Sequence, residues 1–376
     1  MQKSRITLAL LLLWWGILLE TEAVQQPHKK VIYHGWGSPT TKYIREHWEE
    51  MEQLPLDGTT VRIPLKRSGH KVHQKPLFLG SHIFSPYPLH IDDFQFAIDD
   101  LKSAQWKRFT DNFLSVHPSP PRQEYPFSWF DDQQWRAIVQ NWEVIFTIAR
   151  ESGLKGIVFD PETYGIALFT YEKINTEGIP FETYKEKVKS RAKELMRVTN
   201  RVYPTAVLFL LHGYSLVWKH RYIYKIPPEK VVYNLYPSFL DGLVEESGAG
   251  IRIVDGHENT YASKMQFRFE RAHQFFERTA LQEGLFPKYR DQLEVGFPIF
   301  IDCCGPASKY GKVWDPIDFK NNYYPPDLLE YILKSALTIT DRYVWIYAQK
   351  PRFFPPKELS NPYLQAIENA RLLLNK

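Results

Sequence analysis

Two carboxylates stand two residues apart at the end of a short apolar run. The run at 156–159 reads Gly-Ile-Val-Phe, and Asp160-Pro161-Glu162 follows it directly. Residues i and i+2 of an extended chain point the same way, so we expect Asp160 and Glu162 to face one cleft as neighbours. Close carboxylates raise one another's proton affinity, which would keep Glu162 protonated near neutral pH. A protonated carboxyl of this kind is the general acid that cleavage of a glycosidic bond requires.

A second carboxylate, acting as nucleophile or base, is the other requirement of glycoside cleavage. We consider Glu258, Asp302 and Glu245 for this role, in that order, because each stands at the end of a predicted strand or in the loop behind it. The alternative for Asp160 is a purely structural role, in which it caps the next helix or pairs with an arginine. We favour the catalytic interpretation because two carboxylates occur together.

Other polar and aromatic side chains stand at the ends of predicted strands, where a barrel places its functional residues. Asp255, His257 and Glu258 would also suit a metal ion, but short clusters of this kind are common on surfaces, and we expect neither a metal nor another cofactor. For Asp255, a role in forming a turn is the favoured alternative. The residues expected to contact substrate are His34, Trp36, Asn112, Trp129, Tyr164, His212, Tyr214, Glu245, Asp255, Trp345, Tyr347 and Gln349.

These residues need a scaffold, and the chain alternates short apolar or β-branched runs with longer amphipathic segments. Eight strands alternating with helices predict one α/β domain over 24–376, a (β/α)8 TIM barrel. The strand candidates are 31–33, 58–63, 106–113, 156–159, 206–211, 240–244, 293–301 and 342–347. The helix candidates are 40–53, with Ser38 and Thr40 as possible caps, 130–152, 181–203, 261–283 and 326–338.

A doubly wound open sheet is the alternative with the same alternation, and it usually binds a nucleotide through a glycine-rich first turn. Here the first turn reads His34-Gly-Trp36-Gly-Ser-Pro39. This turn lacks the dinucleotide-binding spacing and places a tryptophan where a phosphate would approach. No low-complexity linker or internal repeat interrupts 30–376, which favours a single domain.

The first 23 residues have the pattern of a secretory signal peptide. Lys3 and Arg5 precede an apolar stretch at 6–19, and Ala23 ends the short polar segment behind it. The apolar stretch is shorter than the ~20 residues of a membrane-spanning helix. We therefore expect cleavage near Val24, no membrane contact of the mature protein, and a secreted or periplasmic location.

Composition narrows the classes of function. The net charge of +4 is too small to predict binding to nucleic acid or a membrane surface. Two adjacent cysteines, Cys303 and Cys304, are poorly placed for a disulfide, and the chain has no Gly-x-Ser-x-Gly elbow. Aromatic residues make up 15% of the chain, and a surplus of flat rings in loops suits a carbohydrate partner. The oligomeric state is left open.

Several segments resemble a family of exported bacterial proteins, common in planctomycete-type genomes and described as glycoside hydrolases. The resemblance covers nearly the whole mature chain and implies a barrel that acts on glycans. The family's last strand carries Glu at the position of Gln349; if that Glu is the nucleophile, the resemblance implies an impaired enzyme. The segments are 106–114, 129–132, 156–164, 239–244, 254–258 and 343–347.

Asp160-Pro-Glu162 is also similar to the end of the fourth strand of chitinase-type barrels, in which the substrate's own acetamido group replaces the nucleophile. The two upstream aspartates of that motif fall at Lys155 and Val158, so the match is partial. The favoured hypothesis is an exported glycoside hydrolase that uses carboxylate general acid catalysis. The alternatives are a non-catalytic glycan-binding barrel, a chitinase-like hydrolase, and metal-dependent hydrolysis of another bond.

Overall fold

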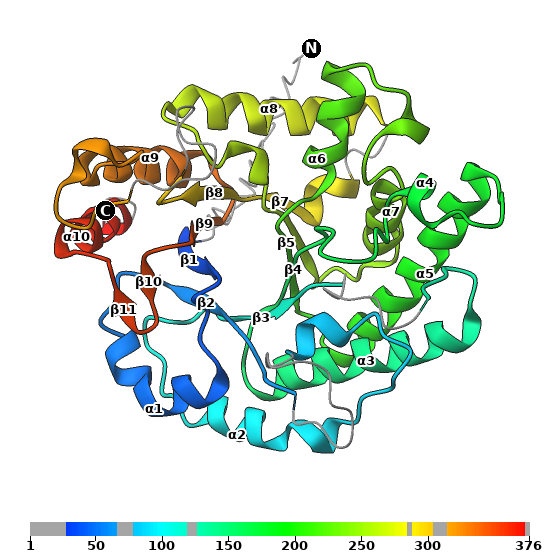
Figure 1. Ribbon diagram of the computed structural model, residues 1–376, viewed down its shortest axis with the longest axis horizontal. Helices are drawn as coiled ribbons and strands as arrows, with labels where there is room; N and C mark the ends of the chain where they lie inside the picture. Colours follow the sequence, from blue (N-terminus) through cyan, green and yellow to red (C-terminus); the bar gives the residue numbers. More distant parts are fainter. Residues whose placement is uncertain (1–27, 66–77, 119–125, 284–287, 304–313, 373–376) are drawn as a thin grey trace, which may run out of the picture.

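The computed structural model describes residues 28–65, 78–118, 126–283, 288–303 and 314–372, in which parallel strands form one ring inside a layer of helices (Figure 1). Neighbouring strands follow the order β7-β6-β5-β4-β3-β2-β1-β9-β8. These strands are β1 (Lys30–Gly35), β2 (Gly58–Val61), β3 (Phe113–Val116), β4 (Gly156–Phe159), β5 (Val207–Leu210), β6 (Arg252–Asp255), β7 (Leu293–Val295), β8 (Phe297–Phe300) and β9 (Tyr343–Ala348).

The ring closes at Gly296, the single residue that separates β7 from β8. β7 pairs with β6, and β8 pairs with β9. The N–H of Gly296 donates to the carbonyl of Asp255 at 2.8 Å, which continues the pairing with β6. β7 and β8 are therefore two halves of one strand of the ring. The predicted (β/α)8 barrel is confirmed.

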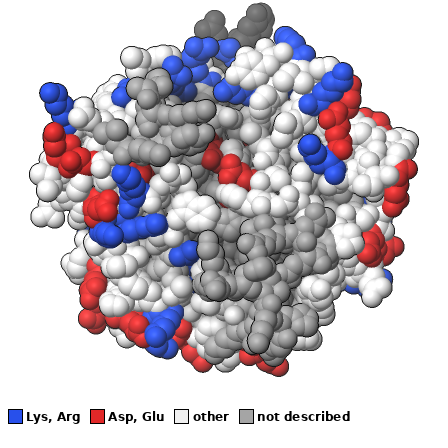
Figure 2. Space-filling view, in the orientation of Figure 1, with Lys and Arg blue, Asp and Glu red and all other residues white. Residues whose placement is uncertain are grey.

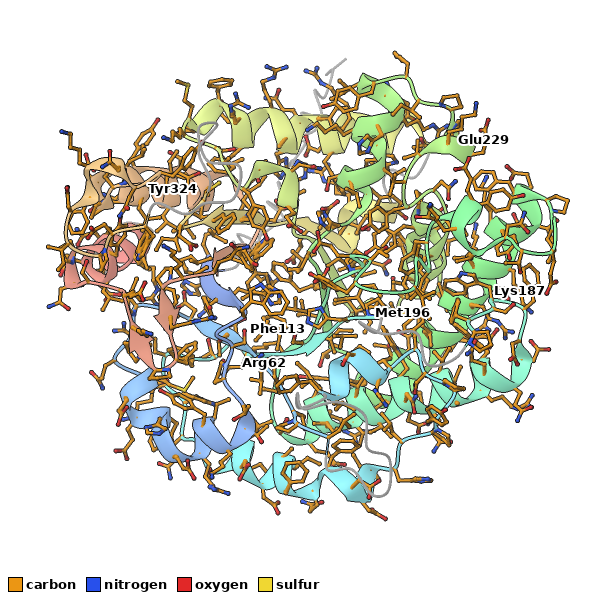
Figure 3. All side chains as sticks on the ribbon, viewed as in Figure 1. Arg62, Phe113, Lys187, Met196, Glu229 and Tyr324 are labelled. Carbon is orange, nitrogen blue, oxygen red and sulfur yellow. The ribbon has the colours of Figure 1, made fainter. Side chains whose placement is uncertain are left out.

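Alternation along the strands divides the apolar residues into two cores. Phe113, labelled in Figure 3, fills the barrel interior together with Phe209 and Trp345. Outward-facing residues of the same strands, such as Val31 and Ile157, pack against the helices. A filled interior confines chemistry to the two ends of the barrel.

Helices cover the outside of the ring (Figure 1). The side chain of Thr40 caps the first of them by accepting a hydrogen bond from the N–H of Tyr43, as predicted. The long helices are α1 (Thr41–Met51), α2 (Gln95–Lys102), α3 (Asp132–Glu151), α5 (Phe181–Val202), α7 (Tyr236–Glu246), α8 (Gln266–Gln282), α9 (Pro326–Ile339) and α10 (Asn361–Leu372). Shorter elements lie in the loops: α4 (Tyr171–Ile174), α6 (Tyr214–Trp218), β10 (Arg352–Phe353) and β11 (Pro356–Lys357).

Two predicted strands are wrong. The segment 240–244 lies inside α7, and β6 supplies the sixth strand instead. A Cβ on Gly242 would lie 2.3 Å from the carbonyl oxygen of Lys189, so this glycine allows α7 to pack closely on α5. The strand predicted at 106–113 ends where β3 begins, because its aromatic residues pack outside the ring: Trp106 lies 6.3 Å from the ring of Trp48.

Three further expectations concern the ends of elements and of the chain. The helix predicted at 261–283 begins only at Gln266, because a separate 3-10 turn, η5 (Glu258–Thr260), precedes it. Among the described residues, no helix has the length and apolar character needed to cross a membrane. The predicted signal peptide and Cys304 lie outside the described residues, and Cys303 is half-buried in the loop after β8.

Candidate active site

The C-terminal ends of neighbouring strands bring the predicted catalytic carboxylates together. Asp160 directly follows β4, His212 lies two residues beyond β5, and Glu258 begins η5 behind β6. Parallel strands of a barrel end at the same rim, so the loops that follow them meet there. Figure 2 shows acidic side chains gathered near the middle of the face it views.

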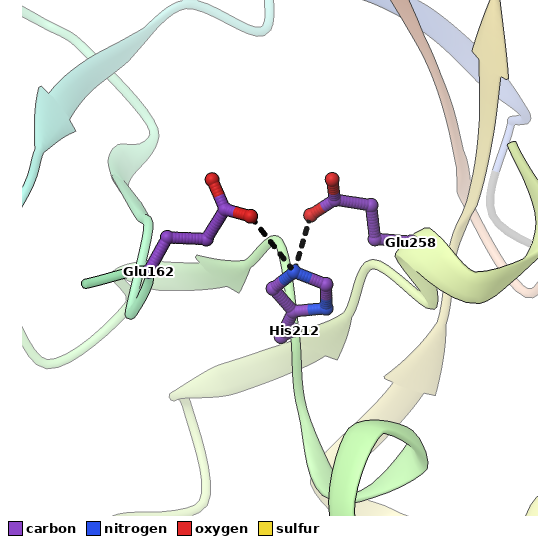
Figure 4. A group of neighbouring side chains, drawn as sticks. All are labelled: Glu162, His212 and Glu258. Atoms are coloured by element: carbon purple, nitrogen blue, oxygen red, sulfur yellow. Dashed lines mark ion pairs between the residues drawn. The ribbon is translucent and has the colours of Figure 1, made fainter. Parts of the chain in front are cut away.

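His212 lies between two glutamates (Figure 4). Its Nε2 is 2.5 Å from Oε2 of Glu258 and 4.0 Å from Oε1 of Glu162. One donor atom from each of the three side chains lies within 4.8 Å of the other two. The side chains of His212 and Glu258 are 10% and 15% exposed, whereas that of Glu162 is 42% exposed. Glu162 is therefore the member of the group that is most open to a substrate.

Burial and charge act in opposite directions on this group. Burial lowers the pKa of His212, but hydrogen bonds with Glu162 and Glu258 outweigh it and raise the pKa to about 10. Burial raises the pKa of Glu258, and the charges of Glu162 and Asp160 add to this effect against the opposing contact with His212. His212 is therefore a cation at neutral pH, and Glu258 is the glutamate of the group whose pKa is raised.

Asp160 is buried and held ionised by His117. Its Oδ2 lies 3.1 Å from Nδ1 of His117, and its Oδ1 accepts the N–H of Glu162 at 3.0 Å. Burial would raise the pKa of Asp160, but the hydrogen bond and charge of His117 bring it down to about 2. The hydroxyl of Tyr164 lies 2.9 Å from Oδ2 of Asp160 and 2.6 Å from Oε2 of Glu162, so it links the two carboxylates.

His34 extends this polar row toward β1. Its Nδ1 is 3.1 Å from the hydroxyl of Thr60, which is itself 2.6 Å from the hydroxyl of Ser38. Burial and the charge of His117 lower the pKa of His34 to about 3, so its imidazole is neutral.

Aromatic residues form the side of the site that follows β9. The ring of Tyr347 lies 5.6 Å from that of Tyr261, and Gln349 donates its amide to the hydroxyl of Tyr347 at 3.3 Å. Trp36, in the turn after β1, is 59% exposed. Trp36, Tyr347 and Gln349 are thus accessible to a ligand, as their assignment to substrate binding requires. Trp345 is not: it is fully buried and donates its indole N–H to the carbonyl of Gly256.

Three of the expected substrate contacts lie away from this site. In each case either the strand predicted before the residue is wrong or its side chain is buried. Asn112 precedes β3 at the opposite end of the barrel and binds the backbone of Thr59 and Phe109. Trp129 is fully buried and donates to the carbonyl of Leu168. Glu245 lies on the outer helix α7, where it pairs with two lysines, Lys189 and Lys193.

Tyr214 is also misplaced as a substrate contact. It is buried at the start of α6, and its hydroxyl donates to Asp241 at 2.7 Å. It lines a separate cavity of about 370 Å³ between α5, α6 and α7, together with Trp218 and Lys185.

Two carboxylates expected in the site, Asp255 and Asp302, bind the backbone of the rim loops instead of facing a substrate. Asp255 is fully buried and accepts hydrogen bonds from Gly213, Ser215 and His257, which fixes the turn that presents Glu258. Asp302 accepts the backbone N–H groups of residues 349 and 350. The turn-forming role considered for Asp255 is therefore the one it has, and Asp302 lacks the exposure that a nucleophile needs.

Sequence reasoning missed two residues of the site. His117 directly follows β3, and placing that strand at 113–116 would have put it at the rim. Tyr261 stands three residues after Glu258, and its pKa is raised well above its ordinary value by burial and by the charge of Glu258. Both residues could have been found from their positions just after a strand. They were missed because the strands before them were predicted at the wrong residues.

No family model matches the chain, and no curated protein matches it in sequence. Among solved structures, a GH5-4 broad-specificity endoglucanase from an uncultured bacterium is 10% identical over 89% of this chain and 85% of its own, with a TM-score of 0.45. An endocellulase from the archaeon Pyrococcus horikoshii is 9% identical over 92% of both chains, with a TM-score of 0.46. The 3-keto-D-glucoside 4-epimerase YcjR from E. coli is 13% identical over 92% of this chain and 98% of its own, with a TM-score of 0.39. Likeness at this level says nothing about what this chain binds or cleaves, and no match supports the resemblance to the planctomycete-type family.

Proposed function

We propose that this protein is a glycoside hydrolase whose catalytic carboxylates are Glu162 and Glu258. The observation that carries the proposal is their separation: one oxygen of each lies within 4.8 Å of the other, at the barrel rim and on either side of a buried histidine. Carboxyl groups about 5 Å apart suit a retaining mechanism, whereas an inverting mechanism needs roughly 6.5–9.5 Å to admit a water.

The electrostatics of the two glutamates support the roles proposed for them. Glu258 has the raised pKa, so it is the acid that protonates the leaving oxygen. Glu162 is the more exposed carboxylate, and the hydroxyl of Tyr164 orients it to attack the anomeric carbon. The proton goes from Glu258 to the leaving oxygen as Glu162 bonds to the sugar. Glu258 then takes a proton from the water that hydrolyses the glycosyl-enzyme. This reverses the expectation from the sequence, in which Glu162 was the acid.

The test compares Glu162→Gln and Glu258→Gln on defined polysaccharides and on aryl glycosides. Both substitutions should reduce turnover of an unactivated glycan by about 10² to 10⁴, because each removes a group that acts in the transition state. Glu258→Gln should recover on an aryl glycoside whose leaving group needs little protonation, and Glu162→Gln should not. Glu245→Gln is the matched control, since Glu245 lies on an outer helix.

Three outcomes decide between the hypotheses. Recovery of Glu162→Gln instead of Glu258→Gln would exchange the two roles. Full activity of either variant would remove that residue from the chemistry. Binding of a glycan by the wild type without any turnover would favour a non-catalytic glycan-binding barrel.

A metal-dependent hydrolase is the second candidate, because Glu162, His212 and Glu258 bring three possible ligand atoms within 4.8 Å of one another. His212 would bind a metal as the neutral imidazole, so metal binding would release its proton. Activity that a chelator abolishes and Zn²⁺ or Mn²⁺ restores would support this candidate. Activity unchanged by a chelator, at metal levels checked by elemental analysis, would favour the two-carboxylate mechanism.

We also propose that the chain is exported, on the sequence pattern of residues 1–23 alone. Mass spectrometry of the secreted protein should find a new N-terminus close to Val24. Intact Met1 on a membrane-bound product would contradict the proposal.

A further inference from the structure

Two arginines at the rim, Arg62 and Arg352, have no carboxylate partner among the described residues. Both are half-buried; Arg62 directly follows β2, and Arg352 begins β10. Arginines without an ion pair elsewhere in the described ranges are exposed. By contrast, the other buried or half-buried arginines there all pair with Asp or Glu: Arg108, Arg191, Arg252, Arg342 and Arg371. Arg62 and Arg352 are therefore exceptions within this protein.

The two arginines flank the turn that follows β1. Nε of Arg62 donates to the carbonyl of Ser38 at 3.0 Å, and its guanidinium lies 4.7 Å above the ring of Phe78. Arg352 packs on Gly37, where a Cβ would lie 2.9 Å from Cδ and 3.3 Å from Nη1 of the arginine. Burial lowers the pKa of Arg62, and the positive charge of Arg352 lowers it further. Two like charges thus share one side of the rim (Arg62 is labelled in Figure 3).

Hydrogen-bonding capacity at this turn is also unfilled within the described part of the chain. Nη1 of Arg352 is buried there without a partner. Half-buried cations without a counterion cost free energy, and a bound anion would offset that cost. The segment 66–77, which comes next in sequence after this strand, contains no Asp or Glu that could serve as the counterion.

This side of the rim is continuous with the proposed active site. Nε of Arg62 donates to the carbonyl of Ser38. The hydroxyl of Ser38 is 2.6 Å from that of Thr60, which lies 3.1 Å from Nδ1 of His34. On the other side, the ring of Tyr347 lies 5.6 Å from that of Tyr261, three residues after Glu258. A sugar chain held at Glu162 and Glu258 would reach the two arginines along these contacts.

We propose that Arg62 and Arg352 bind an anionic group of the substrate, which makes the substrate an acidic glycan bearing carboxylate or sulfate groups. This inference rests on the proposed function for its site. A guanidinium presents a planar fork of N–H donors that matches both anions. Trp36, exposed beside the pair, offers a flat surface for the sugar ring that carries the anion.

The experiment is a calorimetric titration of the full chain carrying Glu162→Gln, so that bound oligosaccharides are not consumed. The probes are an oligogalacturonate, a sulfated galactan oligosaccharide and neutral cellohexaose. Adding Arg62→Gln and Arg352→Gln together should weaken binding of the preferred acidic probe by about tenfold or more. Arg136→Gln on α3 is the control, since Arg136 is exposed and has no ion pair among the described residues. The two acidic probes distinguish carboxylate from sulfate.

Added salt should weaken acidic-probe binding to the Glu162→Gln protein and have less effect once both arginines are replaced. Arg62→Lys and Arg352→Lys are the conservative variants, in case the glutamine variants misfold. Each keeps the positive charge but loses the planar fork of N–H donors, so its affinity for the acidic probe should lie between that of the parent protein and that of the glutamine variant. Acidic probes that bind no better than cellohexaose, or that bind equally well without the arginines, would overturn the inference even if the enzyme cleaves neutral glycans. Arginine-dependent binding by a protein that cleaves nothing would uphold it while the proposed function fails.

Discussion

The two ends of the barrel handle charge in different ways. At the N-terminal end, carboxylates meet permanent cations: Asp57 lies 2.6 Å from Arg371, and Glu294 lies 2.8 Å from Arg342. At the C-terminal rim, the carboxylates of the proposed site meet imidazoles instead: Asp160 lies 3.1 Å from His117, and Glu258 lies 2.5 Å from His212. The pairs at the N-terminal end thus keep fixed charges, whereas imidazole is a group that can bind or release a proton.

Buried polar atoms without a hydrogen-bond partner occur at both ends of the described barrel, and at the N-terminal end they include Oε2 of Glu294 and Nε of Arg342. Nδ1 of His212, Nδ1 of His257 and Nη1 of Arg352 are buried at the rim without hydrogen-bond partners in the described part of the chain. His257 also has a left-handed backbone, with φ of 48°. Unsatisfied groups and strain of this kind are tolerated where function needs them. Substitutions at the two ends should therefore separate stability from activity.

The largest effect expected from breaking an ion pair is at the N-terminal end, from Asp57→Asn. Asp57 accepts two hydrogen bonds from Arg371 and one from the N–H of Val31. Its removal leaves a mostly buried guanidinium without this partner and loosens α10 from the barrel, so we expect a loss of about 3 kcal/mol in the free energy of unfolding. Denaturant titration measures the loss, and turnover of the folded variant should stay within a few-fold.

Glu143→Gln is the control for this change, because Glu143 pairs with Arg201 on an exposed helix surface and should cost less than about 1 kcal/mol. Equal losses for Asp57→Asn and Glu143→Gln would contradict the contrast between the two ends.

A second prediction concerns pH and the rim. The pKa of His212 is raised to about 10 by Glu162 and Glu258 against the effect of burial. A raised pKa means that the stabilisation is fully present below the unfolded-state pKa of about 6.5 and is lost as pH rises through about 10. The difference in unfolding free energy between wild type and His212→Gln should therefore shrink by a few kcal/mol over that window, at about 1.36 kcal/mol per pKa unit.

Chemical denaturation at several pH values, with both proteins in the same buffers, measures this difference. Groups that do not interact with His212 titrate alike in both proteins and cancel in the subtraction. A difference that stays constant from pH 6 to pH 10 would show that His212 is not the charged bridge between the glutamates.

The fold was predictable from the sequence to the extent that each strand stood out from its flanks. The run at 156–159 was predicted at its observed bounds because the polar residues Lys155 and Asp160 flank the four residues Gly-Ile-Val-Phe. The segment 240–244 was mistaken for a strand because five residues containing Leu and Val fit a helix or a strand equally well. β6 itself begins with a charged residue, Arg252, which interrupts the apolar run by which a strand would be recognised.

The site was predictable where a strand end was right, and Asp160, Glu162 and His212 followed from that rule, whereas Glu258 was placed behind a strand predicted at 240–244 that is wrong. What the sequence could not supply was pairing across the rim. His117 and Asp160 are 43 positions apart, so no local pattern shows that one holds the other ionised. The proton affinity of Glu258 depends on burial and on two distant carboxylates, which is why the sequence pattern alone favoured Glu162 as the acid and the proposed function favours Glu258.

The smallest expected effect concerns two tryptophans that the sequence treated alike. Trp36 is 59% exposed at the rim, whereas Trp345 is fully buried in the barrel interior. Trp36→Ala removes a stacking surface and little packing, so KM for the glycan should rise roughly threefold to tenfold with kcat nearly unchanged. Its free energy of unfolding should change by less than about 0.5 kcal/mol. Trp345→Ala leaves a cavity in the core and should instead cost about 3–5 kcal/mol. Steady-state kinetics and denaturant titration on both variants measure the contrast. An unchanged KM for Trp36→Ala would place the sugar elsewhere on the rim and remove the aromatic surface from the proposed path to the arginines.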